Sequence, residues 1–361
     1  MERIHALSEM IRQAEADAVL LTGEVDLIYA TETTGLEGQC LLFSDGTALF
    51  VTDGRYSEAA EQLLAPKGFQ VILCPTSVTG LEFLLELLRE HNVETLLYED
   101  DVLSVRQFTR LSSVFEGIAL KPIRDGIEQL RAVKSETEVD CIIQAQRIAE
   151  DAFAAFLPQL HEGMTEQEAA ALLNYNMAVR GSEKPSFDTI LLFGENTSKP
   201  HGVPSERKLQ YGDCITADFG AVYHGYHSDM TRTFAFGEAS DEFRKVYDIV
   251  LQAQAAAFAA AKADTPCCEM HNAAAAVIAA AGYGEYFTHS LGHSVGLEIH
   301  EMPSASSRCD TPLADGVIMT DEPGIYLAGK FGVRIEDMVL IDGDTPHNLT
   351  DCPKSLLVLE K

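Results

Sequence analysis

The sequence predicts an α/β domain followed by an α+β domain that contains an internal duplication. The chain has 361 residues, enough for two ordinary domains. Short apolar runs alternate with helical patterns up to about residue 123, whereas pairs of helices precede groups of strands beyond it. A charge-rich stretch separates the two patterns. We therefore expect domains at residues 1–124 and 125–361.

In the first domain, each predicted strand is an apolar run of strand length bounded by polar residues. These runs cover residues 18–22, 39–44, 47–53, 70–74 and 95–100. Helical periodicity between the runs predicts helices over 57–64, 81–92 and 105–115. The alternation favours an α/β layer with a largely covered sheet.

The second domain begins with two helices, expected at 135–157 and 165–181. Each opens with Ser or Thr and has Glu three residues later, which is the capping-box pattern. Strand-like runs follow at 189–194, 213–220 and 229–236. The same order then recurs, with helices at 241–263 and 268–282 and strand-like runs around 293–300, 316–326 and 332–342. This repetition predicts the internal duplication.

Charge and cysteine usage restrict the class of protein. Fifty-six acidic residues against 26 basic ones give a net charge of -30, which repels nucleic-acid phosphates and anionic membrane surfaces. We find no signal-peptide pattern and no apolar run of the ~18 residues that a spanning helix needs. The eight cysteines are scattered without a CxxC motif. We therefore expect a cytoplasmic protein that binds neither nucleic acid nor membrane.

Four carboxylates stand where a solvated charge would be unusual. Asp218 lies in an apolar run, and Asp229 follows eleven residues later across a glycine-containing turn. Glu322 and Glu336 lie fourteen residues apart around a similar turn. If each pair belongs to a hairpin, the acids can face each other. Four converging carboxylates would repel one another strongly unless cations balanced them, so the pattern predicts two divalent ions.

The types of donor atom limit which metal ions the site can hold. An oxygen-rich set with one imidazole suits Mn²⁺, Co²⁺, Fe²⁺ or Zn²⁺ rather than copper or an iron-sulfur cluster. Two such ions about 3.5–4 Å apart are a recurrent device of hydrolases and aminopeptidases.

The segment HSLGHSVGLEIHEMP, residues 289–303, offers three imidazoles. The zinc-protease motif HExxH needs a helix, but two glycines disfavour a helix here. The only His-Glu pair, His300-Glu301, lacks a second histidine, so that motif is excluded. On an extended chain His289 and His293 share a face, whereas His300 needs a bulge or bend to join them.

Four segments in chain order carry a family resemblance: DFGAVYHGYHSDMTRTF, HSLGHSVGLEIHEMP, TDEPGIY and GVRIED. They resemble the dinuclear metallopeptidases of the pita-bread fold, which include methionine aminopeptidases, Xaa-Pro aminopeptidases, prolidases and creatinases. The resemblance spans about residues 125–358, and TDGRYSEAAEQ is similar to the first domain of short bacterial Xaa-Pro aminopeptidases. It implies a creatinase-like α/β domain with a mixed sheet, followed by a pita-bread α+β domain.

The resemblance also implies the roles of individual residues. It makes His293 the imidazole ligand beside the four carboxylates, so the implied ligand set is Asp218, Asp229, His293, Glu322 and Glu336. We expect Mn²⁺ at both positions, with Co²⁺, Zn²⁺ or Fe²⁺ as alternatives. The implied catalytic residues are His201, His300 and Glu322, which serve a hydroxide bridging the two ions. The implied substrate-binding residues are His289, Tyr326 and Arg334.

The implied activity is that of an Xaa-Pro aminopeptidase acting on proline-containing peptides, in a homodimer. A prolidase that cuts only Xaa-Pro dipeptides is the nearest alternative. A creatinase-like C–N hydrolase and a non-catalytic peptide-binding module are further alternatives, although relatives of those kinds lose carboxylate ligands. The sequence departs from the family pattern at Lys199, Ser290, Ser294 and Asp321. These positions leave substrate preference open, and Asp321 could alter metal affinity.

Overall fold

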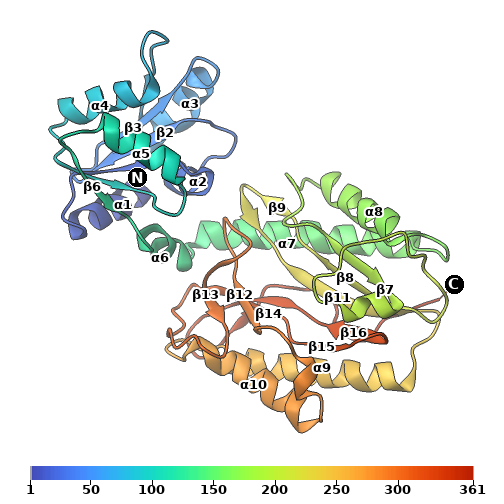
Figure 1. The fold of residues 1–361 in the computed structure, drawn as a ribbon. Helices are drawn as coiled ribbons and strands as arrows, with labels where there is room; N and C mark the ends of the chain where they lie inside the picture. The colour runs from blue at the N-terminus through green and yellow to red at the C-terminus, as the bar shows by residue number, and fades with distance from the viewer. Residues whose placement is uncertain (1, 361) are drawn as a thin grey trace. The chain divides into compact units, whose positions relative to one another are not determined.

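The computed structural model describes residues 2–360. The chain forms two compact units that divide between Arg131 and Ala132, slightly later than the boundary expected at residue 124. Figure 1 shows the elements of each unit, coloured along the chain. Within the described residues, no helix combines the length and the apolar character needed to cross a membrane.

The first unit contains a six-stranded mixed sheet, which confirms the predicted α/β class. The strand order is β4-β3-β2-β1-β5-β6; β1 pairs antiparallel with β2 and parallel with β5. The strands are β1 (Ala18–Leu21), β2 (Gln39–Phe43), β3 (Ala48–Thr52), β4 (Gln70–Leu73), β5 (Thr95–Tyr98) and β6 (Ala119–Pro122). The helices are α1 (Glu2–Gln13), α2 (Glu24–Thr31), α3 (Ser57–Leu64), η1 (Ala65–Lys67), α4 (Gly80–Glu90), α5 (Val105–Val114) and α6 (Gly126–Ala132). The sequence reasoning missed β6, because this edge strand has no apolar run.

The second unit has the predicted repeated order of elements. Its first half contains α7 (Glu136–Phe156), η2 (Leu157–Gln159), α8 (Glu166–Ala178), β7 (Ile190–Phe193), η3 (Gly194–Ser198), β8 (Cys214–Phe219), β9 (Val222–Tyr223), β10 (Tyr226–His227) and β11 (Met230–Phe236). Both predicted capping boxes form, at Ser135 and Thr165.

The second half begins with two helices, α9 (Asp241–Ala260) and α10 (Cys267–Ala280), followed by η4 (Gly284–Tyr286). The strands are β12 (Gly292–Ser294), β13 (Glu301–Ala305), β14 (Ile318–Asp321), β15 (Gly324–Leu327), β16 (Phe331–Arg334), β17 (Asp337–Leu340), β18 (His347–Asn348) and β19 (Val358–Leu359). The recurrence of two helices before a group of strands confirms the duplication.

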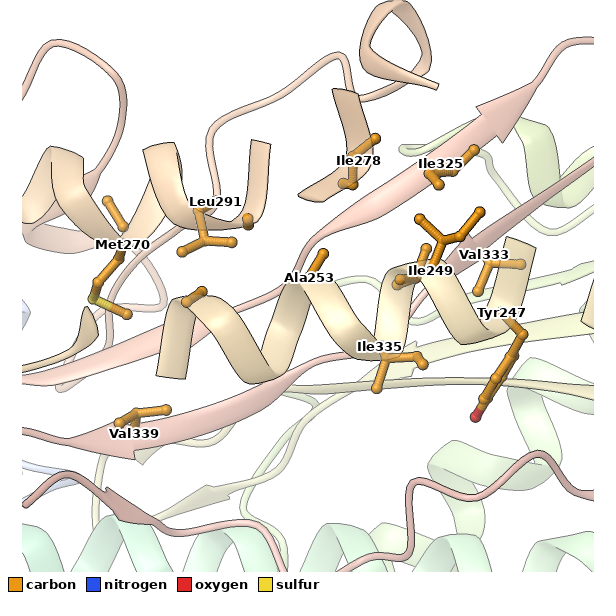
Figure 2. Close-up of a cluster of buried hydrophobic side chains, with 14 of the residues drawn as sticks. Tyr247, Ile249, Ala253, Met270, Ile278, Leu291, Ile325, Val333, Ile335 and Val339 are labelled. Carbon is orange, nitrogen blue, oxygen red and sulfur yellow. The ribbon is translucent and has the colours of Figure 1, made fainter. Parts of the chain in front are cut away.

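Each pair of helices covers one part of a curved strand layer in the second unit. The helices α7 and α8 lie on one side of the strands, and α9 and α10 lie on the other (Figure 1). Figure 2 shows Ile249 and Ala253 of α9 packed with Ile325, Val333 and other buried residues of the strands. Burying a Val or Ile side chain contributes roughly 1.5–3 kcal/mol to the free energy of unfolding. A second buried cluster packs α7 and α8 against β7, β8 and β11, so that two apolar cores hold the strands that carry the predicted ligands.

Strand register explains why the predicted acids meet. Asp321 pairs with Asp337 in the β14–β17 ladder, and Gly324 pairs with Arg334 in the β15–β16 ladder. Glu322 and Glu336 stand opposite each other in the break between these two ladders. The other half supplies a second antiparallel pair, β8 and β11, which confirms the predicted hairpin. Its register sets Asp218 opposite Thr231, so Asp229 is a diagonal neighbour of Asp218 and does not stand directly opposite it.

The strand predicted around residues 293–300 is only partly confirmed. Pairing with β13 shifts register between His293 and Ser294, which marks a bulge. The chain then turns, because the Gly296 N–H donates to the Glu298 carbonyl at 3.0 Å, and residues 296–300 form bends. The turn places the His300 ring beside the His293 ring, with centroids 4.3 Å apart. The sequence predicted such a bend, because on a straight strand His300 would point away from His293.

Candidate active site

One cavity of the second unit brings together all five predicted ligands. Its volume is about 400 Å³, and its wall also includes the predicted catalytic residues His201 and His300. The lining residues are Phe187, Asp188, Thr189, Ile190, His201, Gly202, Val203, Pro204, Asp218, Asp229, His293, Ile299, His300, Glu322 and Glu336.

The donor atoms of the predicted ligands lie close enough to share metal ions. One donor atom each from Asp229, His293 and Glu336 fall within 4.8 Å of one another. His293 Nε2 lies 3.6 Å from Asp229 Oδ2 and 3.6 Å from Glu322 Oε1. Asp218 completes the set from β8. The cluster thus joins donors from both halves of the duplication.

Without cations, the cluster resists ionisation. Burial, together with the charges of Asp218 and Glu322, raises the pKa of Asp229 well above its ordinary value. Burial and the charge of Asp229 do the same to the pKa of Glu336. Burial is also the main cause that raises the pKa of Glu322 to about 8. Each of these acids therefore needs either a proton or a nearby cation.

Two further observations show that the residues fit divalent ions. Among the described residues, Asp218 Oδ1 and Asp229 Oδ1 are buried and have no hydrogen-bond partner. Buried carboxylate oxygens without partners are costly, and a metal ion would satisfy them. Burial and the neighbouring His300 lower the pKa of His293 to about 4, so its imidazole is neutral and able to bind a metal. The donor set suits two divalent cations.

The predicted substrate residues form a hydrogen-bonded chain behind the cavity. His289 Nε2 lies 2.9 Å from the Tyr326 hydroxyl, which accepts a hydrogen bond of 2.8 Å from Arg334 Nη1. Arg334 Nη2 also pairs with Asp218 Oδ2. Tyr326 and Arg334 are buried, and none of the three predicted substrate residues, His289 included, lines the cavity. Their position indicates that they orient Asp218 and leave its other oxygen available to a metal.

Two threonines, which the sequence reasoning missed, hydrogen-bond directly to the predicted ligands. Thr231 donates to Glu336 Oε2 at 2.7 Å, and Thr320 donates to Glu322 Oε1 at 3.3 Å. The Thr320 hydroxyl also accepts the His293 N–H at 3.1 Å. Thr231 lies two residues after Asp229, on the same strand face, and that spacing could have identified it.

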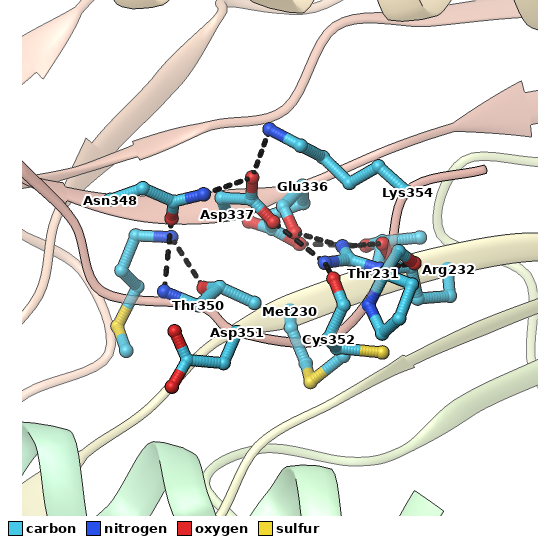
Figure 3. Close-up of polar contacts among 12 residues, drawn as sticks. Met230, Thr231, Arg232, Glu336, Asp337, Asn348, Thr350, Asp351, Cys352 and Lys354 are labelled. Carbon is cyan, nitrogen blue, oxygen red and sulfur yellow. Dashed lines mark hydrogen bonds and ion pairs between the residues drawn. The ribbon is translucent and has the colours of Figure 1, made fainter.

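A buried arginine joins the two halves behind the predicted metal ligands (Figure 3). Arg232 donates to the carbonyl oxygens of Glu336 at 2.6 Å and Cys352 at 2.7 Å. It also pairs with Asp337 Oδ1 at 2.8 Å, and Lys354 reaches Asp337 Oδ2 at 2.6 Å. The network fixes the start of β17, and with it Glu336, against β11.

The four departures from the family pattern lie in different surroundings. Lys199 is exposed and donates to Asn196 Oδ1 at 2.7 Å, and Ser290 is exposed. Ser294 is buried, and its hydroxyl contacts the Met319 sulfur. Burial and the charge of Asp337 raise the pKa of Asp321 well above its ordinary value. A protonated Asp321 would add no negative charge to the metal cluster.

Removing metal from the loaded protein should lower its Tm, and more at pH 8 than at pH 6. The pKa of Glu322 rises from its ordinary 4.5 to about 8 in the metal-free fold. Folded Glu322 thus binds its proton more tightly than unfolded Glu322, so metal-free stability falls as pH rises from about 4.5 to about 8. We expect a chelator to lower Tm by about 5–10 °C at pH 8. Scanning fluorimetry with and without chelator would measure this, and an equal decrease in Tm at pH 6 and pH 8 would contradict it.

The duplicated fold and its carboxylate-rich cavity are those of a metallohydrolase. Residues 140–343 match Metallopeptidase family M24, and residues 3–133 match the Creatinase/Prolidase N-terminal domain. The chain belongs to Metallopeptidase family M24, whose members use divalent metal ions. The predicted pita-bread metallopeptidase is thereby confirmed.

Relatives and solved structures match along almost the whole chain. A Xaa-Pro dipeptidase of Pyrococcus furiosus is 37% identical over 99% of this chain and 99% of its own length. The structure of a Xaa-Pro dipeptidase from Bacillus anthracis superposes with a TM-score of 0.94 at 36% identity, covering 99% of both chains. An X-Pro aminopeptidase structure from Thermotoga maritima gives a TM-score of 0.92 at 38% identity, covering 97% of this chain and 100% of that one.

Proposed function

We propose that the protein is an Xaa-Pro aminopeptidase, which releases an N-terminal residue that precedes proline. The proposal draws on the family and on relatives whose names include both an X-Pro aminopeptidase and Xaa-Pro dipeptidases. It also assigns Asp218, Asp229, His293, Glu322 and Glu336 as ligands of two Mn²⁺ ions.

The composition of the cavity wall supports an aminopeptidase over a strict dipeptidase. Among the described residues that line the cavity, none is Arg or Lys, and the only basic groups are histidines. A strict dipeptidase must hold the free carboxylate next to proline, for which a cation is the usual partner, and with this wall that cation would have to come from the first domain or a partner subunit. Phe187, Ile190, Val203 and Ile299 instead give the cavity an apolar side that suits a proline ring. This wall favours a peptide that continues beyond proline.

The bound ions would lower the pKa of a water molecule and polarise the scissile carbonyl. Glu322 would accept a proton from the attacking water, because its carboxylate faces the cavity. His300 would donate a hydrogen bond to the developing oxyanion, since it lies at the wall beside His293. His201, on the same wall, would contact the peptide or protonate the leaving nitrogen. The series of hydrogen bonds from His289 through Tyr326 to Arg334 would keep Asp218 in place.

A comparison of peptide lengths tests the proposal. The Mn²⁺-loaded protein should cleave Ala-Pro-Ala and longer Ala-Pro peptides at the bond before proline, and should leave Ala-Ala-Ala intact. Hydrolysis of Ala-Pro alone would replace the proposal with the prolidase alternative. Sedimentation of the same sample would test the homodimer, and metal analysis of protein isolated without added metal would test manganese.

A further inference from the structure

A pair of cysteines lies outside the active site in the second unit. Cys267 is the first residue of α10, and Cys309 lies between β13 and β14. The eight cysteines of the described chain are free, and neither of these two lines the metal cavity. Each thiol affects the pKa of the other through a side-chain interaction.

Backbone pairing keeps the two segments together. The Cys267 N–H donates to the Thr311 carbonyl at 3.0 Å, and the Cys268 N–H donates to the Cys309 carbonyl at 2.9 Å. Pro266 and Pro312 form an antiparallel bridge beside them. In this register Cys267 stands opposite Thr311, so Cys309 is its diagonal neighbour across the two paired segments. Cys309 packs against the buried apolar cluster that contains Cys267, which keeps the two side chains near each other.

The two thiols differ in the way that a sensing pair requires. Cys309 is half-buried, whereas Cys267 is fully buried. Burial raises the pKa of Cys267 to about 12. Burial also opposes ionisation of Cys309, but hydrogen bonds from Thr311 and Cys267 hold the pKa of Cys309 below its ordinary value. The thiol that solvent reaches is thus the one that forms a thiolate more readily, and its buried neighbour is protected from direct oxidation.

We propose that Cys267 and Cys309 form a reversible, peroxide-sensitive disulfide. The Cys309 thiolate attacks a hydroperoxide; an S–O bond forms, the O–O bond breaks, and hydroxide leaves. The Cys267 sulfur then attacks the Cys309 sulfur; the S–S bond forms, the S–O bond breaks, and water leaves with the remaining proton. Two thiols are oxidised to one disulfide while one hydrogen peroxide is reduced to two waters.

The cross-link would join the N-terminus of α10 to the segment that leads into β14. A disulfide here closes a long loop, so the oxidised protein should be more stable than the reduced one. We expect a Tm increase of at least about 3 °C that dithiothreitol reverses. Activity should change less than about two-fold, because both thiols lie outside the cavity.

Peptide mapping of the metal-loaded protein tests the proposal. After stoichiometric hydrogen peroxide, non-reducing mass spectrometry should find the Cys267 and Cys309 peptides joined, with the loss of two hydrogen atoms. Cys267→Ser should prevent the cross-link and leave Cys309 to gain oxygen atoms instead. Cys268→Ser is the matched control and should keep the cross-link, since the Cys268 thiol contacts Asp310 rather than Cys309.

Other outcomes would overturn the proposal. Wild-type protein in which both thiols stay reduced, or in which Cys309 joins Cys268, would contradict it regardless of how any variant folds. The mapping does not depend on peptidase activity, so failure of the proposed function would leave this result unaffected.

Discussion

Asp229→Asn and Glu336→Gln are each expected to lower kcat/KM on an Xaa-Pro-Xaa peptide by at least about 10³-fold. Each substitution replaces a buried carboxylate oxygen, in a group of donor atoms within 4.8 Å of one another, by a neutral amide. The amide neither balances cation charge nor keeps both oxygens as donors. Steady-state kinetics and metal content per subunit, measured on the same samples, should fall together.

The metal-free state separates loss of ligation from loss of folding. Burial and neighbouring carboxylates raise the pKa of Asp229 and Glu336 well above their ordinary values, so removing either charge should relieve repulsion there. In chelator, the Tm of each variant should equal or exceed that of wild type. Glu285→Gln, on the exposed η4 turn, is the matched control and should change neither activity nor metal content. Full activity in either ligand variant would refute the assignment.

Local signals were sufficient to predict most of the second unit's fold. Its long helices have clear periodicity, and the capping boxes at Ser135 and Thr165 form as expected. The short strands β9 and β10 could not be predicted, because two-residue strands carry no periodicity. In the first unit, the partly exposed residues of β6 likewise give no apolar signal.

The carboxylate cluster was predictable because each acid interrupts an apolar strand pattern or flanks one. The imidazole was not predictable from spacing alone. The relation of His293 to His300 depends on a register shift and a turn at Gly296, which are set by pairing with other strands. The pair formed by Arg334 and Asp218 spans 116 positions, beyond any local pattern. Family resemblance supplied His293, His300 and Arg334, and the structure explains their proximity to the carboxylates.

The polar network behind Glu336 carried no sequence signal either. Arg232 follows Thr231 in a strand, so strand alternation predicts that it faces solvent. Its side chain is nevertheless only 4% exposed. It acquires its partners only when the two halves of the duplication meet. These partners are the carbonyls of Glu336, Cys352 and Pro353 and the carboxylate of Asp337.

Arg232→Met is expected to lower the free energy of unfolding by about 3–5 kcal/mol. The Asp337 side chain is 2% exposed and would keep only Lys354 and Asn348 as partners. Because the Glu336 carbonyl would lose its donor as well, metal affinity should also fall, by about 10–100-fold. Denaturant unfolding in chelator measures the first effect, and metal titration of the folded variant measures the second. Arg244→Met, on the exposed side of α9, is the matched control and should change unfolding by less than about 0.5 kcal/mol.

A double-mutant cycle separates the ion pair from the backbone contacts. Arg232→Met with Asp337→Leu removes both charges, so no buried carboxylate remains unpaired, and its cost should be smaller than the sum of the single costs by about 1–3 kcal/mol. The double variant should still be less stable than wild type. The backbone carbonyls that accept hydrogen bonds from Arg232 lose their donor whether or not Asp337 is also replaced. Metal affinity should stay low in the double variant for the same reason, since the Glu336 carbonyl is among them. Additive costs would contradict the ion pair as a source of stability, and restored metal affinity would contradict the carbonyl contact as the link to Glu336.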